Sequence, residues 1–229
     1  ISASGLVVAP GFIDTHSHSD LLLFSDPFAK SKITQGITTE IVGQDGFSVA
    51  PIRKEIQPEL ARYLSGLAGQ LEDWEWDTFD SYLNEISELH TAINVASLVG
   101  NGTIRAMTVG FGRRLPSDEE LEQMKELLAD AMMQGAVGIS SGLIYALSSY
   151  ADENELTELC RIAARHGGVH VTHLRNEADR LMESVDEAIR ISSRSGIRLH
   201  ISHHKAVGKG NWGKTKQTLE RIDSEIARG

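Results

Sequence analysis

Short apolar runs rich in β-branched residues alternate along this chain with longer amphipathic stretches. Within the short runs the apolar residues are consecutive, which is typical of parallel strands that are covered on both faces. These runs predict six strands, at residues 6–14, 38–42, 92–99, 136–140, 169–173 and 198–203. The amphipathic stretches between them are predicted to be the helices that connect parallel strands.

Three of these stretches carry signals of a helix boundary. Ser117 with Glu120 three residues later forms a capping box, and Asp152 with Glu155 repeats this spacing. A third helix is predicted to end at Gly196, because glycine commonly terminates helices. The apolar residues at helical spacing are Leu121, Met124, Leu127, Leu128 and Ala131, then Leu156, Leu159, Cys160 and Ala163, then Met182, Val185, Ala188 and Ile189.

Strand–helix units of roughly 30 residues predict an α/β fold, here a TIM-like (β/α)8 barrel. Six of the eight units are visible, so residues 1–229 are predicted to form one partial barrel domain. The sequence opens on Ile1 rather than Met and stops at Gly229 after a helical pattern. We therefore expect strands seven and eight, and any small flanking β domain, outside this sequence. Residues 51–90 are predicted to be helices with an excursion over the barrel mouth, or else a surface elaboration without a catalytic role.

Composition and charge narrow the function classes. Hydrophobic residues make up 41% of the 229 residues and charged residues 24%, as in an ordinary globular protein. The net charge of −10 argues against a nucleic-acid partner, which requires concentrated Lys and Arg. Cys160 is the only cysteine, so no intrachain disulfide forms, and a reducing, cytoplasmic location is predicted. No apolar run is long enough to span a membrane, and no signal peptide is evident.

A pair of histidines follows the first predicted strand, where residues 11–18 read Gly-Phe-Ile-Asp-Thr-His-Ser-His. Side chains two residues apart on a strand point the same way, so His16 and His18 can enter one metal site as neutral imidazoles. The alternative is a pair of hydrogen-bonded or surface histidines. The strand that runs through Pro10-Gly11 into the pair favours the metal site.

Two later strands also end in histidine. His173 is in phase with Val169 and Val171, and His203 with Leu199 and Ile201, so each is predicted to be the last inward-facing residue of its strand. Barrel enzymes place their active sites at this end of the strands. The remaining histidines of these segments are read differently: His170 and His200 are predicted to lie under the helices as scaffold residues, and His204 to lie in the following loop.

Asp45 follows the second strand within Gly43-Gln44-Asp45-Gly46-Phe47. Flanking glycines let the backbone approach a ligand closely. The alternative is a turn-forming aspartate. Because the histidines also lie at strand ends, Asp45 is predicted to be a further metal ligand.

Several strings resemble the N-acyl-D-amino-acid deacylase (D-aminoacylase) family of the amidohydrolase superfamily. They are residues 8–18, 138–145, 149–151, 172–177, 201–205 and 211–213. The resemblance implies a metal-dependent hydrolase that cleaves the amide bond of N-acyl-D-amino acids. It also implies zinc, as one or two ions, with another divalent metal as the alternative.

The resemblance assigns roles to single residues. His16 and His18 match the ligands of a weakly held metal, and His173 and His203 those of a tightly held zinc. At Asp45 this chain departs from the family, whose best-known members have cysteine there; a carboxylate is a harder ligand than a thiolate and favours less zinc-selective binding. Lys205 matches the lysine that binds the substrate carboxylate, the alternative being a solvated surface lysine.

Other positions limit what the resemblance implies. Asn101 replaces a histidine that is common after the third strand, so no role is carried over to it. The fourth predicted strand contains no lysine, which argues against relatives that bridge two metals with a carboxylated lysine. The superfamily's catalytic aspartate lies on the eighth strand and is expected beyond Gly229. Two other functions stay open: another amidohydrolase reaction, such as cyclic amide hydrolysis or deamination, and a non-catalytic barrel scaffold.

Overall fold

All strand pairings are parallel in the part of the chain that the computed structural model describes, residues 2–69 and 74–228. The strands are β1 Phe12–Asp14, β2 Ile37–Val42, β3 Asn94–Ser97, β4 Val99–Gly100, β5 Gly138–Gly142, β6 Val169–His173 and β7 Arg198–Ile201. The helices are α1 Leu22–Ser25, α2 Lys30–Ile33, α3 Gln57–Leu64, α4 Phe79–Glu88, α5 Asn101–Thr108, α6 Asp118–Met133, α7 Glu153–Arg165, α8 Leu181–Ser195 and α9 Lys214–Ile226, with 3₁₀ turns η1 Ser148–Tyr150 and η2 Lys209–Asn211.

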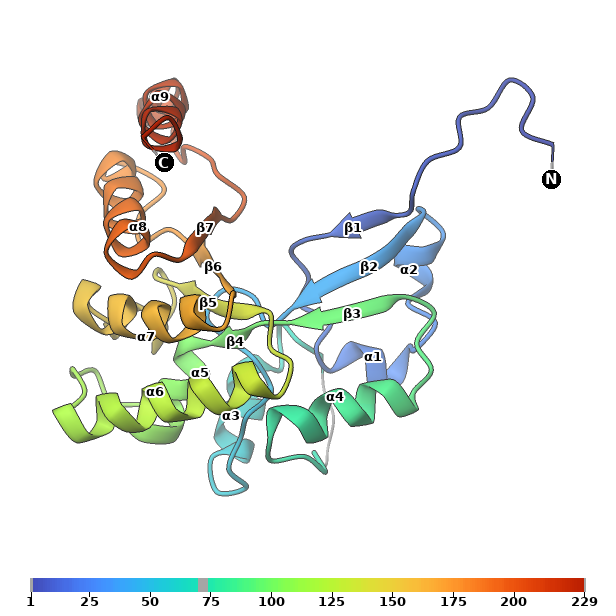
Figure 1. The fold of residues 1–229 in the computed structure, drawn as a ribbon, viewed down its shortest axis with the longest axis horizontal. Coiled ribbons are helices and arrows are strands. Elements are labelled where there is room, and N and C mark those ends of the chain that lie inside the picture. Colours follow the sequence, from blue (N-terminus) through green and yellow to red (C-terminus); the bar gives the residue numbers. More distant parts are fainter. Residues whose placement is uncertain (1, 70–73, 229) are drawn as a thin grey trace.

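The strands form two sheets that follow each other in chain order, β1-β2-β3 and β4-β5-β6-β7. They meet at Leu98, whose amide donates to Val42 O at 3.0 Å, while Val137 N donates to Ser97 O at 3.0 Å. The predicted single strand 92–99 is therefore divided in two at this residue. In Figure 1 the helices α6, α7 and α8 lie along one side of β4–β7, and β1–β3 form a separate arm. The arrangement is that of a partial (β/α)8 barrel.

The first predicted strand is largely wrong. Only Phe12–Asp14 form β1, and Leu6, Val7 and Val8 are between 74% and 92% exposed. The register explains the difference, because Phe12 pairs with Ile37, where β2 begins. Residues before Phe12 therefore have no strand of β2 beside them, and an apolar run without a hydrogen-bonding partner does not form a strand.

The predicted helix boundaries are confirmed. Ser117 Oγ accepts from Glu120 N at 3.2 Å while Glu120 Oε2 accepts from Ser117 N at 2.8 Å. Asp152 Oδ1 caps α7 by accepting from Glu155 N at 2.8 Å, and Gly196 ends α8 with a φ of 73°. None of the helices in the described ranges combines the length and apolarity that crossing a bilayer requires.

Residues 51–90 contain the predicted helices, α3 and α4. In α3, Tyr63 donates to Ala146 O at 3.4 Å in the loop after β5, and its ring lies 5.1 Å from that of Phe47. In α4, Tyr82 is buried and donates to Asp20 O at 3.2 Å. Helix α3 thus reaches the carboxyl ends of the strands, as the predicted excursion requires, while α4 supports the loop after β1.

Candidate metal centre

Four histidine side chains surround the carboxylate of Asp45 at the carboxyl ends of the strands. Asp45 Oδ2 lies 3.5 Å from His16 Nε2, 3.5 Å from His18 Nε2 and 3.8 Å from His173 Nδ1. Asp45 Oδ1 lies 4.0 Å from His203 Nε2. The structure therefore brings together all five residues that the sequence predicts as metal ligands.

The donor set fits a divalent ion. Two ligand atoms at about 2.0–2.1 Å from a tetrahedral ion lie about 3.3 Å from each other, close to the nitrogen–oxygen separations around Asp45. The ring centroids of His173 and His203 are 4.5 Å apart, and those of His16 and His203 are 5.1 Å apart. Asp45 Oδ1 is buried and, among the described residues, has no hydrogen-bond partner. A buried carboxylate oxygen of this kind requires a cation or a donor.

The loop that presents Asp45 is fixed by close backbone contacts. Asp45 itself has a φ of 56°, and Gly43 has a φ of 75°. A Cβ on Gly43 would lie 2.1 Å from Leu98 O, so only glycine fits there. Gly43 N donates to Asp20 Oδ1 at 2.9 Å, and Gly43 O accepts from Ser140 Oγ at 2.5 Å. These contacts therefore fix the backbone from which the Asp45 carboxylate projects.

Electrostatics keep Asp45 ionised. Burial by itself would raise the pKa of Asp45, but hydrogen bonding to His16, His173 and His18 outweighs burial and lowers this pKa far below its usual range. Burial, followed by the nearby Lys205 and His173, lowers the pKa of His203. An ionised Asp45 and a neutral His203 are the forms of these side chains that bind metal.

His16 and His18 lie just after β1, on a segment that is anchored from below by Glu40 of β2. Glu40 is fully buried, and its two oxygens accept from Ser17 Oγ at 2.8 Å and Ser19 Oγ at 2.6 Å. The ammonium of Lys32 lies 3.4 Å from Glu40 Oε2 and donates to Ser17 Oγ at 3.1 Å. The sequence analysis missed Glu40, although a charged residue within the strand Ile37–Val42 is the signal that would have found it.

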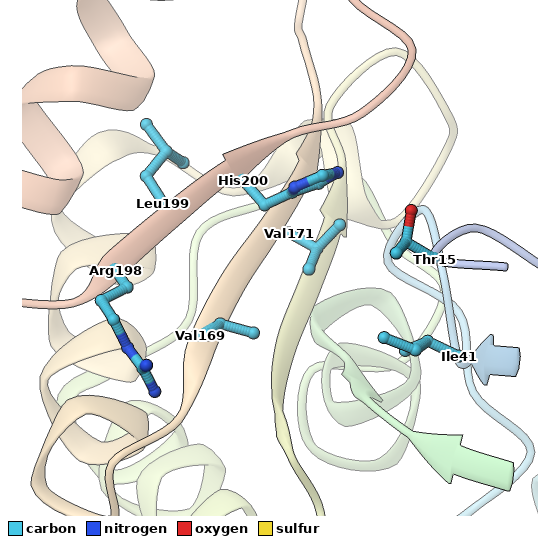
Figure 2. A pocket seen from close by; sticks show the side chains of 7 residues that line it. All are labelled: Thr15, Ile41, Val169, Val171, Arg198, Leu199 and His200. Carbon is cyan, nitrogen blue, oxygen red and sulfur yellow. The ribbon is translucent and has the colours of Figure 1, made fainter. Parts of the chain in front are cut away.

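The prediction that Leu199, Ile201 and His203 share the inward face of the strand is wrong, although the side chain of His203 does reach the site. Val171 pairs with His200, and both line a cavity of about 170 Å³ between β2, β6 and β7 (Figure 2). Leu199 also borders this cavity, and together with Ile201 it packs against the buried cluster of Leu174 and the apolar residues of α8. β7 ends at Ile201, and His203 has a φ of 30°, so a turn rather than strand alternation directs its ring to Asp45.

The other histidines of β6 and β7 have structural contacts. His170 is buried, and its Nε2 lies 2.8 Å from Ser141 Oγ, which confirms its predicted scaffold role. Burial lowers the pKa of His170 to about 4. His204 lies in the loop after β7, where its Nε2 contacts Thr218 Oγ1 of α9 at 2.8 Å.

Asn101, for which the sequence implied no role, is buried at the start of α5. Its Oδ1 accepts from Ser148 Oγ at 2.6 Å, and the same hydroxyl accepts from Gly142 N at 2.8 Å. Gly102 N, one residue on, donates to Gly46 O at 2.8 Å. This segment therefore supports the Asp45 loop from the side of β5.

Glu177 is the second residue that the sequence analysis missed. It is 7% exposed, with Oε1 at 3.2 Å from His203 Nδ1 and Oε2 at 3.5 Å from His173 Nε2. Lys205 Nζ lies 2.6 Å from Glu177 Oε1 and 3.0 Å from His203 Nδ1. By distance alone, two groups in the described residues are able to hold a metal: His16, Asp45 and His203, and His173, Glu177 and His203.

Two further side chains border the centre. Tyr145 Oη lies 3.5 Å from His173 Nδ1, and the two rings are 5.0 Å apart. Burial, together with the charges of Asp45 and Glu177, raises the pKa of Tyr145, so its hydroxyl keeps its proton at neutral pH. The side chain of Lys205 is 46% exposed, which leaves part of its ammonium accessible to an anion.

Comparison with known proteins gives consistent matches. The amidohydrolase family model matches residues 1–221. The D-aminoacylase of Alcaligenes xylosoxydans xylosoxydans is 36% identical over 228 residues, 100% of this chain and 46% of that protein. The N-acyl-D-glutamate deacylase of the same organism is 38% identical over 229 residues, again 100% of this chain and 46% of that protein.

A solved structure matches equally well. The N-acyl-D-glutamate deacylase of Bordetella bronchiseptica, complexed with zinc and a phosphonate inhibitor that mimics the tetrahedral intermediate, has a TM-score of 0.88 and 35% identity. The match covers 99% of this chain and 47% of that chain. The chain thus spans about half the length of these three proteins.

Proposed function

Because the chain belongs to the amidohydrolase family, we propose that it forms the metal-binding part of a zinc-dependent hydrolase that cleaves the amide bond of N-acyl-D-amino acids. The observation that carries this proposal is the convergence of four histidine nitrogens on the buried carboxylate of Asp45, between 3.5 and 4.0 Å away. The names of the two deacylases of Alcaligenes xylosoxydans xylosoxydans support the substrate class.

In this proposal His16, His18, Asp45, His173 and His203 hold the metal. Zinc in such a site lowers the pKa of a bound water toward about 7 and polarises a carbonyl group. The negative charge of Asp45 balances part of the ion's charge, and the loop contacts of Gly43 keep that carboxylate in place. The rigid support matters because hydrolysis depends on a fixed distance between the amide and its nucleophile.

Two residues on the border of the site are assigned to the substrate. The ammonium of Lys205 has three donors, of which one is directed to Glu177, so it retains donors for the carboxylate of the amino acid. The protonated hydroxyl of Tyr145 is a donor for negative charge that develops on the amide oxygen. The general base expected beyond Gly229 stays a prediction.

The identities do not separate the side-chain specificities, since the D-aminoacylase matches at 36% and the N-acyl-D-glutamate deacylase at 38%. The proposal is therefore restricted to the chemistry that both names share. We expect the full-length protein to release free amino acid from N-acetyl-D-amino acids and not from the L-enantiomers, cyclic ureides or aminated purines.

Replacing His173 or His203 by Ala tests the proposal directly, because both side chains would be ligands. We expect each variant to lose its zinc and its activity while the metal-free proteins melt as the wild type does. His166→Ala, at the end of α7, is the matched control and should retain both. Normal zinc content in both variants would exclude the proposed site, and hydrolysis of a cyclic ureide or a purine alone would replace the proposed reaction.

A further inference from the structure

We propose that Glu177 is a positioning residue that holds both His173 and His203 in the orientation that binds metal. The inference rests on the ligand set proposed above. It assigns to one buried carboxylate the support of the two ligands that come from β6 and β7. A ligand on a strand end has a rotatable ring, so its metal-binding nitrogen needs a partner for the opposite nitrogen.

Each histidine presents opposite ring nitrogens to the two carboxylates. His203 directs Nε2 to Asp45 and Nδ1 to Glu177. His173 directs Nδ1 to Asp45 and Nε2 to Glu177. A neutral imidazole carries its proton on one nitrogen only, so the nitrogen that binds metal requires the proton on the other. Glu177 places one oxygen near each ring, and in this proposal it would accept both of these protons.

The burial of His173 Nε2 indicates why this nitrogen needs the Glu177 carboxylate as a partner. His173 Nε2 is buried and, within the described ranges, lacks a hydrogen-bond partner closer than the Glu177 oxygen at 3.5 Å. The backbone of Glu177 is fixed as well, since Val207 N donates to Glu177 O at 2.7 Å. Glu177 therefore lies on an anchored loop, with Oε2 3.5 Å from the ring nitrogen that it is proposed to support.

Glu177 also lies close enough to His173 and His203 to bind a metal with them directly, but two contacts argue against that role. An ion between His173, Glu177 and His203 would use the ring nitrogens that face away from Asp45, so the buried Oδ1 of Asp45 would stay without a partner. The ammonium of Lys205, 2.6 Å from Glu177 Oε1, already occupies the place of a cation there. The ion belongs on the Asp45 side of the rings.

Lys205 fits the same arrangement. With the ring proton on His203 Nδ1, Lys205 cannot donate to that nitrogen and pairs with Glu177 Oε1 instead. One carboxylate oxygen accepts from both groups, because it has two lone pairs. Glu177 thereby links the proposed substrate-binding ammonium to the proposed metal ligands, and its loss should affect zinc binding before it affects the fold.

The test is the zinc affinity of the full-length protein, measured by competition with a chromophoric chelator. We expect Glu177→Gln and Glu177→Ala to weaken zinc binding by about 10-fold to 100-fold. Gln keeps the shape but accepts from only one ring at a time. The loss of zinc affinity should therefore be smaller in Glu177→Gln than in Glu177→Ala. Glu177→Asp, which keeps the charge, should recover part of the affinity. Glu183→Gln removes an exposed carboxylate paired with Arg180 and should leave the affinity unchanged.

Melting of the metal-free proteins separates positioning from folding, since the Glu177 variants should melt within a few degrees of the wild type. His173→Ala and His203→Ala are the reference for loss of a ligand. If the two histidine variants lose zinc while Glu177→Gln and Glu177→Ala bind it normally, the inference is wrong and the ligand set stands. A loss in Glu177→Ala as severe as in His173→Ala would instead make Glu177 a ligand and overturn the inference. Retention of zinc by the histidine variants would remove the proposed site together with this inference.

Discussion

Glu40 Oε2 accepts a hydrogen bond from Ser17 Oγ at 2.8 Å, directly beneath the turn that carries His16 and His18. Ser17 separates the two histidines in sequence, so this contact fixes the backbone from which both rings project. The other oxygen of Glu40 accepts from Ser19 Oγ at 2.6 Å, on the far side of His18. The histidine pair is thus held by a buried charge in the neighbouring strand.

Replacing Glu40 should therefore weaken the fold and the metal site together. Glu40→Ala removes two hydrogen bonds to a buried charged group, and we expect a loss of about 2–4 kcal/mol in the free energy of unfolding. Glu40→Gln preserves the shape and should lose only about 1 kcal/mol. Urea unfolding measures both values, with Glu119→Gln on α6 as the exposed control. A change below about 0.5 kcal/mol in Glu40→Ala would contradict this account.

Substitutions at Asp45 can separate the effect of its negative charge from the effect of its backbone conformation. Asn tolerates a positive φ, so Asp45→Asn keeps the loop conformation while it removes the negative charge. We expect Asp45→Asn to bind zinc at least about 10-fold more weakly. Asp45→Cys should bind zinc and increase its preference over manganese, because thiolate is the softer ligand. Metal content and chelator competition measure these effects; full zinc affinity in Asp45→Asn would exclude Asp45 as a ligand.

Gly43 should be far more sensitive to substitution than a glycine with open space around it. In Gly43→Ala the new methyl group would meet the carbonyl of Leu98, and the positive φ adds a second penalty. We therefore expect the free energy of unfolding to fall by about 2–4 kcal/mol. Gly110 has a φ of 80° with no atom within 4 Å of an added Cβ. Gly110→Ala should therefore cost only about 1 kcal/mol and leave zinc binding intact. Equal losses in the two variants would contradict the close contact.

His170 should make the stability depend on pH. Burial lowers the pKa of His170 to about 4, against about 6.5 in the unfolded chain. The unfolded state therefore takes up a proton first, and stability that is present above pH 6.5 is lost as the pH falls toward 4. The loss amounts to about 3 kcal/mol. Urea unfolding in chelator should give a flatter pH profile for His170→Gln than for the wild type, and the same slope in both would contradict this assignment.

Lys205 should select substrates that carry a carboxylate. We expect Lys205→Met to raise the KM for N-acetyl-D-amino acids by about 10-fold to 100-fold, the value of a charge-assisted hydrogen bond. The KM for the corresponding carboxamides should change little. Lys209→Met, in the exposed turn η2, is the control. A parallel rise for both substrates in Lys205→Met would show that the lysine acts on something other than the carboxylate.

The predictions from sequence hold where the signal is local. The caps at Ser117 and Asp152 and the strand at 169–173 depend on neighbouring residues, and the structure contains all three. The convergence of the five proposed ligands was predicted for a related reason, since strand ends of a parallel barrel meet at one face.

The incorrect predictions depend on contacts between distant segments. The strand at 6–14 lacks a partner before Phe12, and the facing of β7 could not be extended to His203 because this residue leaves the strand through a turn with a positive φ. Glu40 was missed because Ser17, from which it accepts, is 23 positions away. Glu177 was missed because His203 is 26 positions away, although His173, its other neighbour, is only four. Spacing along the chain does not reveal such contacts.

Because the two sheets meet at Leu98, an ion in the proposed site would also have a mechanical role. His16, His18 and Asp45 extend from the sheet of β1–β3, whereas His173 and His203 extend from the sheet of β4–β7. Under the proposed ligand set, an ion would join these two groups directly, in addition to the hydrophobic core that both sheets share and the hydrogen bonds of Ser140 to the Asp45 loop. Any opening at Leu98 would pull the ligands apart. Occupancy of the proposed site would therefore report on the alignment of the two sheets.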